Sequence, residues 1–192
     1  MPRIFPEFED FFVGYGSYHD NLINKLIHVV CIPLISITLF MISFWFDTFG
    51  NKGETESFFA INLGLCLYLF TSFLYLNVDL VSGVISSIFY GVGYVVGRNM
   101  YLNAVTNGTQ DELWKVVLTV HIVCWIAQFV GHGVFEKRAP ALMDNLLLTL
   151  VAPDFVIIEV LFFLGWRKDV EERCVKKIHE NIEKFREAKK LK

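Results

Sequence analysis

Five long apolar segments constrain the fold of this 192-residue chain more than any other feature. They cover residues 26–46, 58–76, 80–97, 113–131 and 146–166. Each is close to the length of about 17 to 25 residues that an apolar helix needs to cross a bilayer core. The chain is 54% apolar, and its mean hydropathy of +0.48 lies outside the usual range of soluble proteins. We therefore predict an all-α fold, a polytopic helical membrane protein embedded in a lipid bilayer.

Basic residues are concentrated at the C-terminal end. Residues 167–192 contain 10 of the 17 Lys and Arg residues but 6 of the 20 Asp and Glu residues, so this tail has a net charge of +4 and the rest −7. Because cytosolic segments of membrane proteins are enriched in Lys and Arg, we expect a cytosolic C-terminus. The chain thus divides into a membrane-embedded domain, residues 1–166, and a basic cytosolic tail, residues 167–192.

The tail also has the pattern of an amphipathic helix. Its apolar residues recur at steps of three and four positions: Val170, Cys174, Ile178, Ile182 and Phe185. Two arrangements fit this pattern. Either the helix lies on an anionic membrane leaflet, or it packs as a solvated charged helix on the protein's own cytosolic face.

The fifth apolar segment contains a helix breaker at Pro153. Proline has no amide hydrogen, and it biases the preceding Ala152 away from helical dihedral angles. We therefore predict that residues 146–166 form two half-helices, a re-entrant hairpin, rather than a full span. Four spans then remain.

Four spans place the N-terminus, the turn at residues 77–79, the His132 region and the tail on one side of the membrane. The loops around Lys52 and Arg98 lie on the other side. The start of the first span and the end of the fourth are both cytosolic, so we expect His28 and His132 to meet there. The first 25 residues lack an apolar signal-peptide region, so the first span is expected to direct insertion.

Four of the five histidines lie in or beside the apolar segments: His19, His28, His121 and His132. An unpaired imidazole is costly to bury among apolar helices. A single buried histidine commonly hydrogen-bonds to a neighbouring helix, but four together favour a metal or catalytic site. Neutral imidazole suits iron, copper, zinc and nickel, so the histidines alone do not identify the ion. The four cysteines have no C-x-x-C spacing, so we interpret them as packing residues.

The stretch QFVGHGVFEKRAPAL, residues 128–142, is the most specific motif. His132 and Glu136 are four positions apart, which places both on one helix face, where they can converge on one ion or one proton. Two other roles fit Glu136. It pairs with Lys137, Arg138 or the dipole of the next helix, or it orients His132.

Helix geometry limits which histidines can share an ion. His121 and His132 are eleven residues apart on one helix face, which separates them by about 16 Å along the axis at 1.5 Å per residue. Direct co-ligation therefore requires the helix to unwind near Gly131. Otherwise His121 belongs to a second site or to a proton relay.

His19 and His28, nine residues apart, point to opposite faces of a continuous helix. Their convergence also requires a break, and Asn24 is a tolerable place for one. We interpret Gln128 as a residue that makes interhelical hydrogen bonds, a common use of amides in bilayers.

Two segments together resemble a known family. They are Tyr15-x3-His19-x4-Asn24-x3-His28-x4-Pro33, and His121 followed by residues 128–142. Their order and hydrophobic spacing are similar to those of the fungal Mpo-type family of iron-dependent 2-hydroxy-fatty-acid dioxygenases, which act in the endoplasmic reticulum in phytosphingosine breakdown. The resemblance extends up to Trp166. It implies that His19, His28, His121 and His132 hold Fe(II), and we expect catalytic roles for His19, His28, His132 and Glu136.

The resemblance also implies a reaction: dioxygen converts a long-chain 2-hydroxy fatty acid into a fatty acid one carbon shorter. The 2-hydroxyl and carboxylate can chelate a metal with open positions while the acyl chain lies between apolar helices. The terminal Lys189-Lys190-Leu191-Lys192 resembles a dilysine signal, which fits the endoplasmic reticulum membrane. We expect no nucleic-acid partner, and the sequence does not set the oligomeric state.

Two other function classes fit the same residues. The first is a non-enzymatic membrane scaffold or lipid-binding protein with structural histidines. The second is a metal-dependent lipid hydrolase that uses His132 as ion ligand and Glu136 as base. Stoichiometric metal in the purified protein separates the scaffold from the enzymes, and oxygen consumption separates the dioxygenase from the hydrolase.

Overall fold

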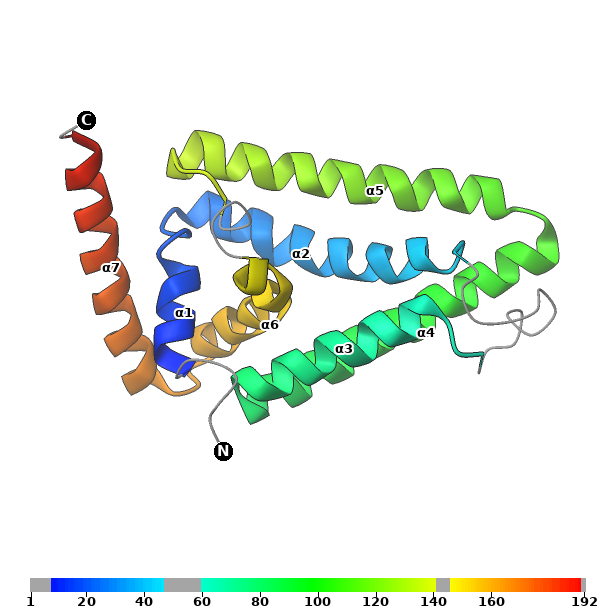
Figure 1. Ribbon diagram of the computed structural model, residues 1–192, viewed down its shortest axis with the longest axis horizontal. Coiled ribbons are helices and arrows are strands. Elements are labelled where there is room, and N and C mark those ends of the chain that lie inside the picture. Colours follow the sequence, from blue (N-terminus) through cyan, green and yellow to red (C-terminus); the bar gives the residue numbers. More distant parts are fainter. Residues whose placement is uncertain (1–7, 47–59, 141–145, 191–192) are drawn as a thin grey trace.

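The computed structural model describes residues 8–46, 60–140 and 146–190, and this part of the chain is helical without any strand (Figure 1). The elements are α1 (Phe8–Gly16), α2 (Leu22–Ser43), α3 (Leu63–Val78), α4 (Leu80–Asn107), α5 (Gln110–Val130), the π-helix η1 (Gly131–Glu136), α6 (Leu146–Phe163) and α7 (Lys168–Lys190). The predicted all-α fold is confirmed.

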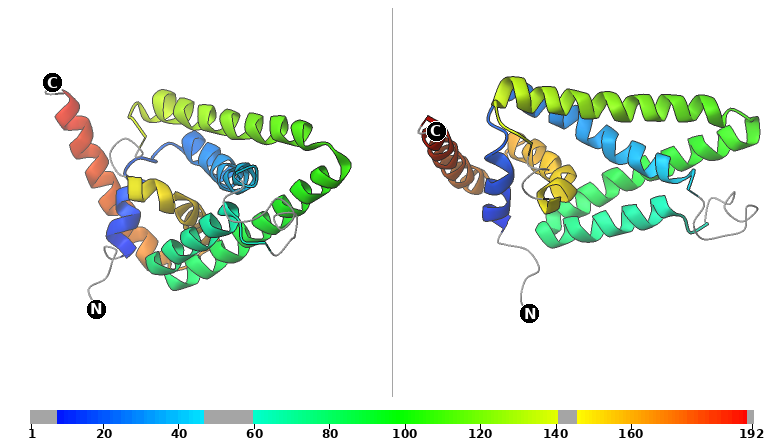
Figure 2. Two further views of the ribbon diagram at one scale, coloured as in Figure 1. Left: turned by 45° about the vertical axis from the view of Figure 1, so that its right-hand side comes forward. Right: turned by 45° about the horizontal axis from the view of Figure 1, so that its top comes forward.

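The longest helices run lengthwise through the molecule. α2 packs against α5 along one side and against α4 along the other, and α3 pairs with α4 as an antiparallel hairpin. Gly83 permits this pairing, because a Cβ there would lie 2.6 Å from the backbone of Tyr75. Towards one end of the molecule the α2–α5 pair and the α3–α4 pair diverge, and α6 lies between the two pairs (Figures 1 and 2). α1 and α7 pack together across that end.

Three helices are long and apolar enough to cross a membrane: Leu22–Ser43, Leu80–Asn107 and Gln110–Glu136. α3 is apolar but shorter, and α6 and α7 make a fourth candidate only as a pair bent by 118°. Large apolar side chains cover the outer faces of these helices, as Leu26, Ile88 and Val116 do with at least 57% exposure. Such exposed apolar surface is typical of lipid-facing helices. The described residues thus contain three to four candidate spans, and the predicted count of four stays a prediction.

The predicted break at Pro153 is wrong. α6 is continuous from Leu146 to Phe163 with Pro153 inside it, and the chain instead bends after Phe163, where Gly165 has a φ of 93°. Tertiary hydrogen bonds hold the helix at this point. The buried Asp154 carboxylate accepts from the hydroxyls of Ser82 and Ser86 on α4, at 3.1 and 2.6 Å.

Arg98 does not lie in a loop, contrary to the sequence prediction. α4 extends to Asn107, and Arg98 is buried within it. Its guanidinium lies 5.3 and 5.5 Å from the ring centroids of Phe44 and Tyr101. The apolar segment predicted from the sequence ended at residue 97. Cation–π contacts stabilise the buried Arg98 guanidinium, so α4 continues past that point. The loop expected around Lys52 lies outside the described residues.

The tail forms the expected helix, α7, and its apolar face packs on the protein itself. Cys174, Ile178 and Ile182 are buried in the same core as Phe12 of α1. This packing corresponds to the second of the two arrangements that the sequence allowed.

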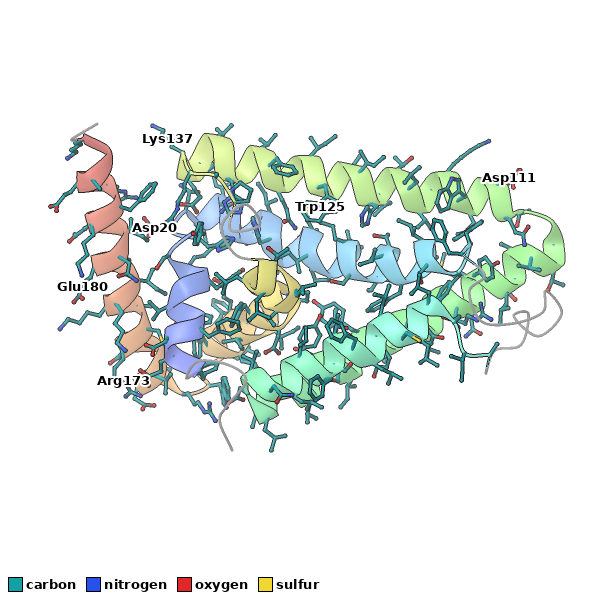
Figure 3. The ribbon with its side chains drawn as sticks, viewed as in Figure 1. Asp20, Asp111, Trp125, Lys137, Arg173 and Glu180 are labelled. Carbon is teal, nitrogen blue, oxygen red and sulfur yellow. The ribbon has the colours of Figure 1, made fainter. Side chains whose placement is uncertain are left out.

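One end of the bundle gathers the segments predicted to share a side. α1, the start of α2, η1 and α7 meet there, and Figure 3 places Asp20 and Lys137 at this end and Asp111 at the opposite one. The expected meeting of His28 and His132 is confirmed, since their ring centroids are 4.9 Å apart.

Candidate metal centre

Three histidines from three segments converge at this end of the bundle. His19 follows α1, His28 lies in α2 and His132 in η1, and their possible ligand atoms are all within 4.8 Å of one another. The side chains are 2 to 3% exposed. Among the described residues, no carboxylate or thiol belongs to this group.

Backbone carbonyl groups fix the tautomers of two of these rings. The Nδ1–H of His19 donates to Tyr15 O at 2.9 Å, and the Nδ1–H of His28 donates to Asn24 O at 2.8 Å. Each Nε2 therefore carries a free lone pair, the form in which imidazole binds a metal. The Nε2 of His19 is buried without a hydrogen-bond partner.

His132 reaches the group from the first turn of the π-helix. Gly131 lies directly against α2, because a Cβ at this position would overlap Oδ1 of Asn24. The Nδ1 of His132 is buried and has no hydrogen-bond partner. A π-helix re-aims side chains relative to the preceding α-helix and is frequent at functional sites.

Burial keeps the ring of His19 neutral. The pKa of His19 is well below its usual value of 6.5, chiefly because burial disfavours the charged ring and secondly because His28 and His132 are adjacent. A neutral imidazole keeps the lone pair that a metal requires.

Glu136 faces the start of α2 but lies outside the histidine group. Its Oε1 accepts hydrogen bonds from the backbone N–H of Asp20 and Asn21, both at 2.9 Å, and from Nδ2 of Asn24 at 3.0 Å. The carboxylate thus satisfies free donors at the N-terminus of α2, where negative charge is favoured. It also fixes the turn that carries His19. We expected Glu136 and His132 to converge on one ion. In the structure, Glu136 instead binds the start of α2 and is not part of the histidine group.

The break between His19 and His28 lies earlier than expected. α1 ends at Gly16 and α2 begins at Leu22, whereas Asn24 is fully buried inside α2. Asn21 provides the N-cap, since its side chain accepts from the N–H of Ile23 at 2.9 Å.

His121 is separate from the cluster. Its Nδ1–H donates to Thr38 Oγ1 at 2.8 Å, and its Nε2 accepts from Trp125 Nε1 at 3.1 Å. Both ring nitrogens are therefore committed. α5 is continuous up to Val130, so the unwinding that co-ligation requires does not occur between His121 and the cluster.

A cavity of about 320 Å³ adjoins the histidines. Its wall extends along α2 from His28 to Phe40, which corresponds to about 18 Å at 1.5 Å per residue. Most of its lining is apolar. The lining residues are Tyr15, His19, His28, Ile32, Ile35, Ser36, Leu39, Phe40, Thr71, Tyr75, Trp125, Gln128, His132, Pro140, Leu148, Thr149, Leu150, Ala152 and Pro153.

Sequence reasoning included Tyr15 in the family motif but assigned it no role in the site. Tyr15 lines the cavity, and its ring stacks on His19 with centroids 4.2 Å apart. The i, i+4 spacing of Tyr15 and His19 on an apolar helix was the available signal.

Comparison with known proteins identifies the family. Residues 5–164 match the family described as "2-hydroxy-palmitic acid dioxygenase Mpo1-like". The chain belongs to this family. The matched region of the Mpo1-like chain includes all three clustered histidines and ends just before the bend into α7.

A curated relative supports the same assignment. The Mpo1-like chain is 36% identical over 158 residues to the 2-hydroxy-palmitic acid dioxygenase MPO1 of Saccharomyces cerevisiae, covering 79% of this chain and 78% of that protein. No solved structure matches the chain.

Proposed function

We propose that this protein is an Fe(II)-dependent dioxygenase that shortens long-chain 2-hydroxy fatty acids by one carbon, in the catabolism of sphingolipid long-chain bases. The observation that carries the proposal is the three-histidine cluster at the end of an apolar cavity, in a chain of the Mpo1-like family.

The residues present fit a metal ion. The Nε2 of His19 and the Nδ1 of His132 are buried without partners, a costly arrangement that a cation would relieve. His19, His28 and His132 would hold the ion, whereas His121 has no nitrogen to offer. When bound, iron would supply the one-electron chemistry that lets dioxygen react with a closed-shell substrate.

The charge of the site favours an anionic substrate. Three neutral imidazoles leave the charge of a divalent cation uncompensated, and no described carboxylate joins them. A 2-hydroxy acid offers both a negative charge and a second oxygen for chelation. The apolar cavity then accommodates the acyl chain and excludes water.

The overall reaction balances without a further reductant. One 2-hydroxy acid and one dioxygen contain the atoms of the shortened acid, one carbon dioxide and one water. The bond between C1 and C2 breaks, C1 and C2 are oxidised, and dioxygen accepts the electrons. The protein therefore needs to bind only two substrates.

The hydrolase alternative receives little support from the site. Its proposed base, Glu136, has Oε1 engaged by three donors at the start of α2 and lies outside the histidine group. A scaffold does not require unpartnered histidine nitrogens, which cost stability unless something binds them.

The test is an assay of the detergent-purified protein with Fe(II) and oxygen. We expect 2-hydroxyhexadecanoic acid to yield the acid one carbon shorter with stoichiometric oxygen consumption. Hexadecanoic acid should not turn over, because one chelating group is missing. Activity without oxygen, or equal turnover of both acids, would contradict the proposal.

We also propose that the histidine end of the bundle lies on the cytosolic side of the endoplasmic reticulum membrane, because the tail is rich in Lys and Arg. Tags before His19 and at the C-terminus should both be accessible to protease in sealed microsomes. Protection of both tags would place this end in the lumen, and protection of one tag alone would place the termini on opposite sides of the membrane and contradict the assignment.

A further inference from the structure

Besides the ring nitrogens of His19 and His132, two polar groups in the cavity wall lack hydrogen-bond partners. They are the hydroxyl of Tyr15 and Nε2 of Gln128, both buried. Other hydroxyls in the same wall are satisfied internally: Ser36 Oγ donates to Ile32 O at 3.0 Å, and Thr71 Oγ1 donates to Leu67 O at 3.0 Å. A buried donor without a hydrogen-bond partner costs stability. Two such donors in the wall of one cavity therefore indicate that a ligand binds there.

The two groups flank the histidines from different helices. Tyr15 precedes His19 by four residues, and its ring lies between His19 and Phe155, with centroid distances of 4.2 and 4.8 Å. Gln128 precedes His132 by four residues on α5. Tyr15 thus contacts a clustered histidine directly, and Gln128 lies about one helical turn from another.

We propose that Tyr15 and Gln128 form the head-group subsite, in which the phenol O–H and the amide N–H donate hydrogen bonds to the substrate carboxylate. This inference rests on the proposed function, because it takes a fatty acid as the ligand. A carboxylate only accepts hydrogen bonds, and both unpaired groups are donors. Charge-assisted hydrogen bonds offset the loss of water when the carboxylate enters an apolar cavity.

The subsite predicts selectivity for acids. The acyl chain fits the apolar wall whatever its head group, but only an acid pairs both donors with one charged acceptor. The corresponding alcohol offers only a neutral oxygen, so its hydrogen bonds to the two donors are not charge-assisted. Recognition by these two side chains does not require the metal.

The test uses the full chain with Tyr15→Phe and Gln128→Met, which keep the ring and the side-chain length but remove the donors. Tyr68→Phe is the matched control, because Tyr68 lies outside the cavity lining and its hydroxyl donates to Ser87 O at 3.1 Å. We expect the KM for 2-hydroxyhexadecanoic acid to rise about ten- to a hundredfold in each variant, with iron content unchanged. The control should change KM by less than about threefold.

A binding measurement on iron-free protein separates this inference from the proposed function. Hexadecanoic acid should bind the two variants about ten- to a hundredfold more weakly than wild type, whereas the affinity for 1-hexadecanol should fall less than about threefold. Unchanged acid binding would overturn the subsite even if wild type is an active dioxygenase. Loss of iron in Tyr15→Phe would also overturn it, because the hydroxyl would then act through His19. An inactive wild type that still shows the acid-specific loss would refute the oxygenase and leave the subsite intact.

Discussion

The bundle contains two histidine environments that the sequence presents as alike. At the midpoint of α5, His121 lies between Thr38 and Trp125, which form hydrogen bonds with its two ring nitrogens. At the end of the bundle, three histidines contact one another, and two buried ring nitrogens have no partner.

Hydrogen-bond partners of the ring nitrogens, rather than burial or hydropathy, distinguish a structural histidine from a candidate metal ligand. A histidine whose two ring nitrogens are both hydrogen-bonded has no free lone pair for a metal, wherever it lies in the bundle. The unpaired nitrogens at the other site persist because the backbone carbonyls and α2 hold the rings in place.

The largest effect should come from removing a clustered histidine. His28→Ala and His132→Ala should each lose bound iron and at least about a hundredfold in activity, because two imidazoles hold a metal poorly. Iron per protein and oxygen consumption measure both effects, with the helical circular dichroism spectrum as the check on folding. Wild-type iron content in both variants would eliminate the metal site.

Glu136→Gln should have a smaller, positional effect. The amide cannot serve three donors as a carboxylate does, so the turn carrying His19 loosens and stability falls by about 1–3 kcal/mol. Iron affinity should weaken by about tenfold. Glu112→Gln, an exposed change at the opposite end, is the control in thermal unfolding and iron titration. Complete loss of iron would instead make Glu136 a ligand.

His121→Phe should leave iron content unchanged and lower activity only severalfold. The substitution leaves Nε1 of Trp125 without its acceptor, and Trp125 lines the cavity, so we expect a stability loss of about 1–3 kcal/mol. Thermal unfolding and iron analysis of the same sample measure both. If iron is lost as in His132→Ala, the contrast between the two environments is false.

The smallest effect should come from the surface ion pair between Glu9 and Arg173, 2.7 Å apart on α1 and α7. The hydrogen bond from Arg173 lowers the pKa of Glu9 below 4.5, so the pair stabilises the fold above that pH and its contribution is lost as the pH falls. Glu9→Gln should lower Tm slightly at pH 7, less at pH 4 and hardly at all in high salt. Activity should not change.

The sequence by itself determined the helical class, the shared end of His28 and His132, and the amphipathic pattern of α7. These features depend on local periodicity and on the even number of predicted crossings, which a linear pattern contains. The family resemblance was equally readable, because it rests on the order and spacing of His19, His28 and His132.

Only the tertiary structure decided which polar groups have partners. Thr38, 83 residues from His121, occupies a ring nitrogen of that histidine, and Ser86, 68 residues from Asp154, helps α6 continue through Pro153. The same packing leaves Tyr15 and Gln128 unpaired beside the histidines. Hydrogen-bond partners come from segments far apart in the chain, and no spacing within a single helix specifies them.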